Sequence, residues 1–536
     1  IEKVKDVAIT KEIGGRSRAL KVILDKDKMA ENGVDALSIM QMIQANNSKS
    51  QSGSFVNNDE ELLLTTGRFL TSQEDVENLV IGVNAQLPVY LKQVAMIVDG
   101  PATAQNYVAF GYGKGNEKFK DFKSEYPAVT ISIGKVKGAD AMKISDKILE
   151  KVESLKQNLI TNDVQVEVSR NYGETASHKV GELLLHLGVA IVAVTLLVML
   201  AMGWRGGLVV FFSVPLTFAL TLFAYYMLGY TLNRITLFAL VFVVGIVVDD
   251  SIIIAENMHR HFKMKRLPFK QAAIFAINEV GNPTNLATFT VIAAILPMAF
   301  VSGMMGPYMS PMPIGASIAM ILSLFVALTV TPYLGYHLLH EKDEQKHKAE
   351  QGLEISTVYK IYQKIERPFL ENSFKRNTIL IVTVILLFGS VAMFFTKSVL
   401  VKMLPFDNKN EFQVVIDMPE GTTLERTAAV TQEIAQYLTT IPEVVDYQNY
   451  IGTSAPITFN GLVRHYDLRG GSNMADIQVN LLHKEDRDLQ SHDIAKIVRP
   501  EIQKIAKKYN ANVKIIEVPP GPPVLSTLVA EIYGPD

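Results

Sequence analysis

The sequence predicts an α+β membrane protein, in which a bundle of spanning helices is joined to soluble regions that mix strands and helices. The first observation is a set of six apolar runs in the middle of the chain, each near the roughly 20 residues that a helix needs to cross a bilayer. The second is the polar character of both ends, where short alternating runs indicate strands between helical patterns. The overall composition, 48% hydrophobic and 20% charged over 536 residues, averages these two kinds of segment.

Charge and cysteine content exclude several functional classes. The net charge of −2 gives no reason to expect nucleic acid as a partner. The chain contains no cysteine, which excludes disulfides, zinc–thiolate sites and thiol chemistry. It begins with Ile1 and shows no signal peptide, so we expect it to be an internal piece of a longer protein.

The first 178 residues are predicted to be soluble. Alternation over residues 19–24 indicates a strand, and apolar spacing over residues 34–44 indicates a helix. Residues 46–60 (NNSKSQSGSFVNNDE) are polar and contain Gly, so they are predicted to form a protruding loop, with the run LLLTTGRFL as the strand returning from it. A strand, a helix and a second strand are predicted at residues 128–133, 139–155 and 164–168.

The distribution of basic residues orients the predicted spans, which are residues 183–202, 208–228, 235–255, 283–301, 314–339 and 378–395. The segment 260–270 holds five Lys or Arg residues and the segment between the fifth and sixth spans holds eight, whereas loops 229–233 and 302–313 hold none. Cytoplasmic loops are enriched in Lys and Arg, so the basic loops are predicted to be cytoplasmic and both soluble ends to lie outside.

An amphipathic helix is predicted between the fifth and sixth spans. Ile355, Val358, Tyr362, Ile365 and Phe369 recur at spacings of three and four residues. Such a helix lies either on the cytoplasmic membrane surface or against protein, and the pattern favours neither.

The last 140 residues return to soluble patterning. Two strand–helix–strand units are predicted, at residues 412–416, 424–438 and 444–450, and at residues 475–482, 491–508 and 513–518. Two such units in series predict the split βαβ arrangement of ferredoxin-like domains.

Two adjacent carboxylates, Asp249 and Asp250, lie in the third predicted span. Each costs roughly 2.5–3.5 kcal/mol at the centre of a membrane helix, so intramembrane carboxylates are functional by default. They lie about 100° apart on a helix, so both can point into a bundle but not along one line. Gly245 lies one turn before them, and Glu256 and Asn257 extend the polar stripe. The pair is interpreted as a proton relay; the alternative is a structural cluster with satisfied hydrogen bonds.

These residues carry a family resemblance. The segment VVGIVVDDSIIIAENMHRH resembles the fourth transmembrane helix of the RND (resistance–nodulation–cell division) permeases, especially the AcrB-like multidrug exporters. The segment LPFDNKNEFQVVIDMPEGTTLERT resembles the one that follows their seventh helix. The resemblance implies a Gram-negative-type inner-membrane protein that is not an enzyme, needs no cofactor and exports drug-like amphiphilic compounds by proton antiport.

The resemblance also implies partners and a domain organisation. The partners are lipids, two further copies in a homotrimer, a periplasmic adaptor and an outer-membrane channel, and residues 46–60 correspond to a hairpin that reaches a neighbouring protomer. The cation that pairs with Asp249 and Asp250 is a Lys on a second membrane half. The implied parts are a porter portion at 1–20, a docking subdomain at 21–112, the rest of that porter at 113–178, the spans at 179–340, a cytoplasmic segment at 341–377, the last span at 378–395 and a second periplasmic porter region at 396–536.

The long connection at residues 452–473 is a second candidate site. In drug-exporting relatives the corresponding loop borders the substrate pocket, so the resemblance makes Phe459, Arg464, His465 and Tyr466 candidate lining residues. The alternative is an ordinary long connection, although loops of this length are often functional.

Other functions remain open on the sequence. The ten His residues show no metal-ligand spacing, and His259 and His261 are expected at the membrane interface. Methionines within apolar runs are expected to fill the core, although an RND-type exporter of heavy-metal cations is an alternative. An RND-related lipid exporter, secretion factor or sterol-sensing receptor is another. An intramembrane aspartyl protease is remote, because its two carboxylates must face each other across a gap and no G-x-G-D motif is present.

Overall fold

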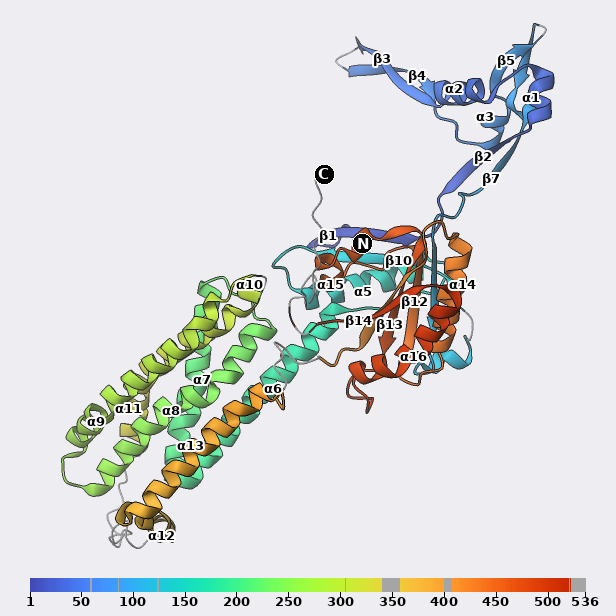
Figure 1. Ribbon diagram of the computed structural model, residues 1–536. Helices are drawn as coiled ribbons and strands as arrows, with labels where there is room; N and C mark the ends of the chain where they lie inside the picture. The colour runs from blue at the N-terminus through green and yellow to red at the C-terminus, as the bar shows by residue number, and fades with distance from the viewer. Residues whose placement is uncertain are drawn as a thin grey trace, which may run out of the picture. The chain divides into compact units, whose positions relative to one another are not determined.

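The computed structural model describes residues 1–57, 60–84, 86–122, 125–303, 305–339, 357–399, 407–519 and 521. The chain divides into two units (Figure 1). The first, here called the helical unit, comprises residues 1–10, 133–407 and 518–536, and the second, the sheet unit, comprises residues 11–132 and 408–517.

Six helices of the described chain are long and apolar enough to cross a membrane. They are α6 (Tyr172–Met202), α7 (Trp204–Met227), α8 (Arg234–Met264), α9 (Phe269–Ile295, continued by the 3-10 helix η2, Leu296–Phe300), α11 (Pro311–Leu338, preceded by α10, Met305–Met309) and α13 (Ser373–Phe395). The six predicted spans are therefore confirmed as helices. The fourth begins earlier than predicted, because the helix continues through Pro283, which membrane helices tolerate.

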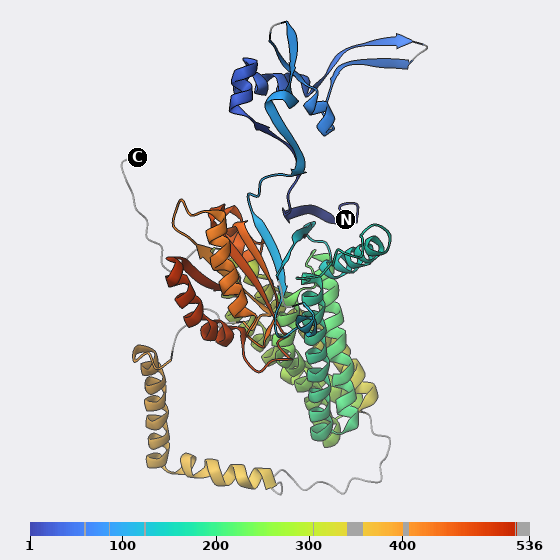
Figure 2. The ribbon, with the colours of Figure 1, turned by 90° about the vertical axis from the view of Figure 1, so that its right-hand side faces the viewer.

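Helix α8 is packed against α7, α9 and α11 (Figures 1 and 2). It begins at Asn233, whose side chain accepts hydrogen bonds from the backbone N–H groups of Ile235 and Thr236. Its buried apolar face includes Leu240, Val243, Val247 and Ile254. Close approach between α7 and α11 depends on Gly315, since a Cβ atom there would overlap the Tyr225 hydroxyl.

The amphipathic helix predicted before the last span is α12 (Thr357–Glu371), and it leads through Asn372 into α13. Residues 341–356, including Ile355, and the side chain of Val358 lie outside the described residues.

The core of the sheet unit follows the predicted order of strands and helices. It contains β11 (Glu411–Asp417), α14 (Leu424–Leu438), β12 (Val444–Thr453), β13 (Gly470–Leu481), α16 (Ser491–Tyr509) and β14 (Asn512–Glu517). The sheet runs β14-β11-β13-β12 and continues into β8 (Tyr107–Tyr112) and β9 (Tyr126–Pro127), with every recorded pairing antiparallel.

The two faces of this sheet differ because side chains alternate along each strand. On β13, Ala475, Ile477 and Val479 belong to the apolar core that α14 and α16 share with the strands (Figure 1). Asp476 and Asn480 lie on the opposite face and are also buried. Local periodicity therefore predicted the order of these elements.

One predicted strand is wrong. Strand β1 (Val7–Gly14) pairs with β10 (Val129–Lys135), and α5 (Ala141–Asn158) follows as predicted. Residues 164–168, however, form no strand in the structure. Alternating side chains alone do not make a strand, because the backbone also needs a neighbour with which to form a ladder.

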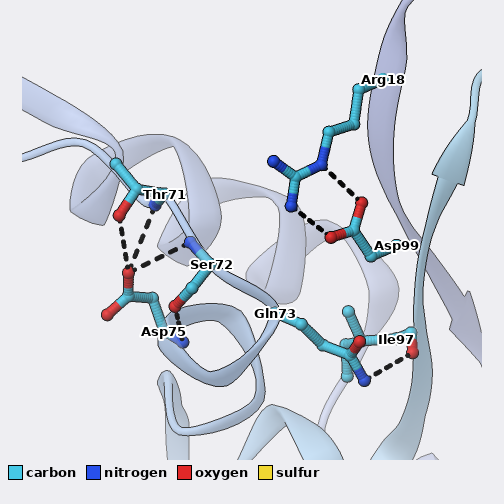
Figure 3. Close-up of polar contacts among 7 residues, drawn as sticks. All are labelled: Arg18, Thr71, Ser72, Gln73, Asp75, Ile97 and Asp99. Atoms are coloured by element: carbon cyan, nitrogen blue, oxygen red, sulfur yellow. Dashed lines mark hydrogen bonds and ion pairs between the residues drawn. The ribbon is translucent and has the colours of Figure 1, made fainter. Parts of the chain in front are cut away.

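The remainder of the sheet unit contains β2 (Arg18–Leu24), α1 (Lys26–Asn32), α2 (Ala36–Asn46), β3 (Ser48–Asn57), β4 (Glu60–Arg68), α3 (Gln73–Glu77), β5 (Val80–Asn84), β6 (Leu87–Tyr90), α4 (Leu91–Val94) and β7 (Ala95–Pro101). Arg18 and Asp99 form a bidentate ion pair between β2 and β7 (Figure 3). Ser72 and Asp75 form a capping box on α3 (Figure 3), so local hydrogen bonds hold this small region in shape.

The loop predicted at residues 46–60 is instead largely a strand, and the hairpin that the resemblance implies at this place is present. β3 pairs with β4 in an antiparallel hairpin, with a bulge between Gln51 and Gly53. The returning strand was predicted correctly. The polar composition of β3 led to the loop prediction. An exposed hairpin strand needs no apolar face, because hydrogen bonds to its neighbouring strand hold it in place.

Candidate functional site

The candidate site is centred on Asp250, in the middle of α8. Its side chain is only 7% exposed, although it is surrounded by largely apolar helices. Burying a carboxyl group in such a place is costly unless it is neutralised or hydrogen-bonded. The neighbouring helices supply the hydrogen bonds.

The nearest hydroxyl belongs to Thr288 on α9. Its Oγ1 lies 3.3 Å from Asp250 Oδ1 and 2.9 Å from the Thr284 carbonyl oxygen. A hydroxyl carries one proton and two lone pairs. Thr288 can therefore donate to an ionised Asp250, or donate to Thr284 and accept a hydrogen bond from a protonated Asp250.

Ser323 on α11 offers the same choice from the other side. Its hydroxyl donates to the Val247 carbonyl at 2.7 Å and also lies within hydrogen-bonding reach of the Asp250 carboxyl group. Because both hydroxyls can donate or accept, the site can hold Asp250 in either protonation state.

Further hydroxyls lie towards the next turns of α8. Ser251 and Thr331 are 3.3 Å apart, and Thr331 lies 3.0 Å from Ser213 on α7. All three side chains are buried. They form a polar connection through α8, α11 and α7 that the sequence analysis missed, since isolated Ser and Thr residues in apolar helices give no distinctive pattern.

Asp249 does not share the environment of Asp250. It is exposed, so the structure does not bring the two carboxylates into one pocket of this bundle. The supporting stripe also divides: Asn257 is buried on the Asp250 side of α8, whereas Glu256 is exposed on the Asp249 side. Positions seven residues apart nearly coincide around a helix, so the single predicted stripe is corrected to two neighbouring stripes.

Asn257 belongs to a polar cluster that was not predicted from the sequence. Its amide donates to Glu279 Oε2 at 3.0 Å and to the Ala276 carbonyl at 2.8 Å, both on α9. The guanidinium of Arg260 lies 3.0 Å from both Glu279 oxygens, and His261 Nε2 lies 2.7 Å from Oε2. One carboxylate on α9 therefore gathers three side chains from consecutive turns of α8. The sequence signal that could have indicated this cluster was Glu279, an acidic residue within the largely apolar helix α9.

The four residues of the second candidate site lie in one connection between β12 and β13. Phe459 begins α15 (Phe459–Val463), His465 has a positive φ of 57°, and Tyr466 begins the 3-10 helix η4 (Tyr466–Leu468). Arg464 and Tyr466 are half-buried and His465 is exposed. The side chain of Phe459 lies outside the described residues. The structure places these residues in a single connection, and their role in a substrate pocket stays a prediction.

This connection is fixed to the sheet at both ends. The Ala455 N–H donates to Asp476 Oδ2 at 3.0 Å, and Arg469 donates to Asp417 Oδ1 at 2.6 Å and to the Ile416 carbonyl at 3.0 Å. Arg469 Nε lies 3.5 Å from Asp476 Oδ1, an ion pair without a hydrogen bond. Burial raises the pKa of Asp476 to about 6, since the nearby hydrogen bond and guanidinium only partly offset the loss of water.

Comparison with known proteins identifies the family. The profile of the AcrB/AcrD/AcrF family matches residues 1–524, nearly the whole chain. The chain belongs to the AcrB/AcrD/AcrF family. This confirms the resemblance to RND permeases that the segment around Asp249 and Asp250 indicated.

Individual relatives within this family are distant. The chain is 28% identical to the multidrug resistance protein MdtC of Pantoea ananatis over 357 residues, which are 66% of the chain and 33% of MdtC. It is 28% identical to MdtC of Proteus mirabilis over 341 residues, 63% of the chain and 31% of that protein. An uncharacterized transporter of Haemophilus influenzae is 22% identical over 506 residues, 93% of the chain and 47% of the relative. The chain thus spans from about a third to about half of the length of these relatives.

Proposed function

We propose that this AcrB-family chain is part of an inner-membrane proton/substrate antiporter that exports drug-like or amphiphilic compounds. Asp249 and Asp250 are the proton relay, and no cofactor is required. The observation that carries the proposal is the burial of Asp250 beside the hydroxyls of Thr288 and Ser323, which can serve both of its protonation states. The names of the MdtC relatives support the substrate class.

The two carboxylates have different parts in this mechanism. Asp250 binds a proton inside the bundle, where an ionised carboxylate is costly and protonation neutralises it. Asp249 lies on an exposed stripe of α8, where a Lys from a second membrane half would pair with it and be released on protonation. Each inward proton supplies about 2.3 kcal/mol per 100 mV of membrane potential.

The soluble regions are assigned to export outside the membrane. We assign residues 408–517, with their βαββαβ order, to a ferredoxin-like porter subdomain, and residues 21–101 to a docking subdomain. The predicted docking bound at residue 112 is corrected, because β8 (Tyr107–Tyr112) pairs with β12 in the porter sheet. Support for the periplasmic placement comes from the basic loops at the opposite ends of the helices. The assembly is a homotrimer with a periplasmic adaptor and an outer-membrane channel, and the loop with Phe459, Arg464, His465 and Tyr466 borders the substrate path.

The test is dye efflux from cells that express the complete gene. Asp249→Asn and Asp250→Asn keep the size and the hydrogen-bonding capacity of each side chain but cannot carry a proton. We expect both variants to be inserted normally and to lose efflux. Asp163→Asn, the same change at an exposed site outside the spans, is the matched control and retains efflux. Normal pumping by both relay variants would make the pair structural and refute the proposal.

The same experiment separates the alternatives. A wild-type protein that clears no dye but lowers intracellular copper or silver would favour a metal exporter. Within the described residues, no group of three or more His, Asp or Glu side chains is arranged to hold a metal ion. An aspartyl protease is disfavoured by the divergence of Asp249 and Asp250 on one helix.

A further inference from the structure

The junction of α12 and α13 combines an exposed apolar face with basic side chains. Ile361 and Ile365 on α12 are both more than half exposed, and Phe374 at the start of α13 is 80% exposed. Helix α13 is apolar enough to span the membrane, and α12 joins its N-terminal end through Asn372.

The two helices meet at an elbow (Figure 2). A cavity of about 330 Å³, open to its surroundings, lies there. Lys364 and Arg367 line it from α12, Lys375 lines it from α13, and Asn372 lines it from the turn between them.

The cavity has an excess of positive charge. Its one acidic side chain, Glu371, accepts a hydrogen bond of 2.5 Å from Arg367 Nε, and this contact raises the pKa of the guanidinium. Within the described residues, no carboxylate pairs with the ammonium groups of Lys364 and Lys375. Two lysines therefore remain available to a ligand.

The backbone adds to this charge. The Asn372 side chain accepts from the N–H groups of Phe374 at 2.9 Å and Lys375 at 3.5 Å, which fixes the N-terminus of α13 at the cavity. The N-terminus of this 23-residue helix carries the positive end of its dipole and favours an anion nearby.

We propose that this elbow binds the phosphate headgroup of an anionic phospholipid in the cytoplasmic leaflet. The apolar face of α12 and the exposed Phe374 select a lipid over a soluble phosphate, because acyl chains cover these surfaces while the lysines hold the headgroup. The inference rests on the proposed orientation, in which the basic segment before α13 is cytoplasmic.

The test is native mass spectrometry of the full-length protein with phosphatidylglycerol or phosphatidylcholine. We expect Lys364→Gln combined with Lys375→Gln to weaken phosphatidylglycerol retention on the order of tenfold, and phosphatidylcholine retention to stay unchanged. The matched control, Lys263→Gln with Lys265→Gln, removes two exposed lysines at the C-terminal end of α8 and retains the lipid. Equal weakening in both double variants, or none in the first, would overturn the proposal.

Four further measurements make the result specific. Glu371→Gln releases Arg367 and is expected to strengthen phosphatidylglycerol retention, an outcome that misfolding cannot produce. Inorganic phosphate at millimolar concentration should not displace the lipid, and displacement would identify a soluble-phosphate site instead.

Asp250→Asn should retain the lipid while losing efflux, so the lipid-binding proposal and the proposed function can fail separately. Labelling of Lys265→Cys by an impermeant thiol reagent only from outside the cell would overturn the orientation.

Discussion

The Thr288 hydroxyl lies 3.3 Å from Asp250 Oδ1 and 2.9 Å from the Thr284 carbonyl, so its one proton has two acceptors. Thr288→Val keeps the shape and removes this choice, whereas Thr288→Ser keeps the hydroxyl. A hydrogen bond of this kind contributes about 0.5–1.5 kcal/mol, so we expect Val to reduce efflux roughly 3- to 10-fold and Ser to retain most of it.

Proton-coupled efflux measured as a function of external pH checks this prediction. A purely packing role for Thr288 would lower the rate equally at every pH. A role in balancing the two states of Asp250 shifts the pH at which efflux is half-maximal in the Val variant. Equal profiles for Val, Ser and the wild type would contradict the role of the hydroxyl.

The Glu279 cluster is expected to stabilise the contact between α8 and α9. Glu279→Gln keeps a hydrogen-bond acceptor for Asn257 but loses the charge that attracts Arg260. Water screens the charge of this partly exposed carboxylate, so its hydrogen bonds contribute less than those of a buried charged pair. We expect a lower melting temperature for the full-length protein in detergent. Glu256→Gln, on the exposed stripe of α8, is the control and should melt like the wild type.

Sequence patterning predicted the elements of this chain better than it predicted the site. The spans and the βαββαβ order follow from apolar periodicity, which is a local property. The exposed hairpin strand β3 and the residues at 164–168 were misassigned, since strand formation depends on a distant partner. Asp249 and Asp250 stood out because charge is rare in a span. Their separate environments, and the cluster around Glu279, depend on which helices pack together.

The buried Asp476 predicts a pH dependence of stability in the sheet unit. Its pKa is about 6 in the folded protein against an ordinary value of 3.8, so folding favours the protonated form. This contribution to stability is complete below about pH 4 and is lost as the pH rises through 6. Two pKa units correspond to at most about 3 kcal/mol.

Asp476→Asn removes this titration and keeps the acceptor for the Ala455 N–H. We expect the variant to melt above the wild type at pH 8, with the difference shrinking at pH 4. A variant that melts below the wild type at pH 8 would show that the ion pair with Arg469 outweighs the cost of burial.

The contact between Gly315 and Tyr225 predicts a steric limit in the bundle. Gly315→Ala would place a methyl group against the Tyr225 hydroxyl and ring, and overpacking of this kind costs about 1–3 kcal/mol. Gly389→Ala in α13 meets no atom within 4 Å and should be neutral or slightly stabilising. Thermal melting compares the two, and Tyr225→Phe should partly rescue Gly315→Ala because the hydroxyl oxygen is the closest atom. A Gly315→Ala protein that melts like Gly389→Ala would show that α7 and α11 move apart without cost.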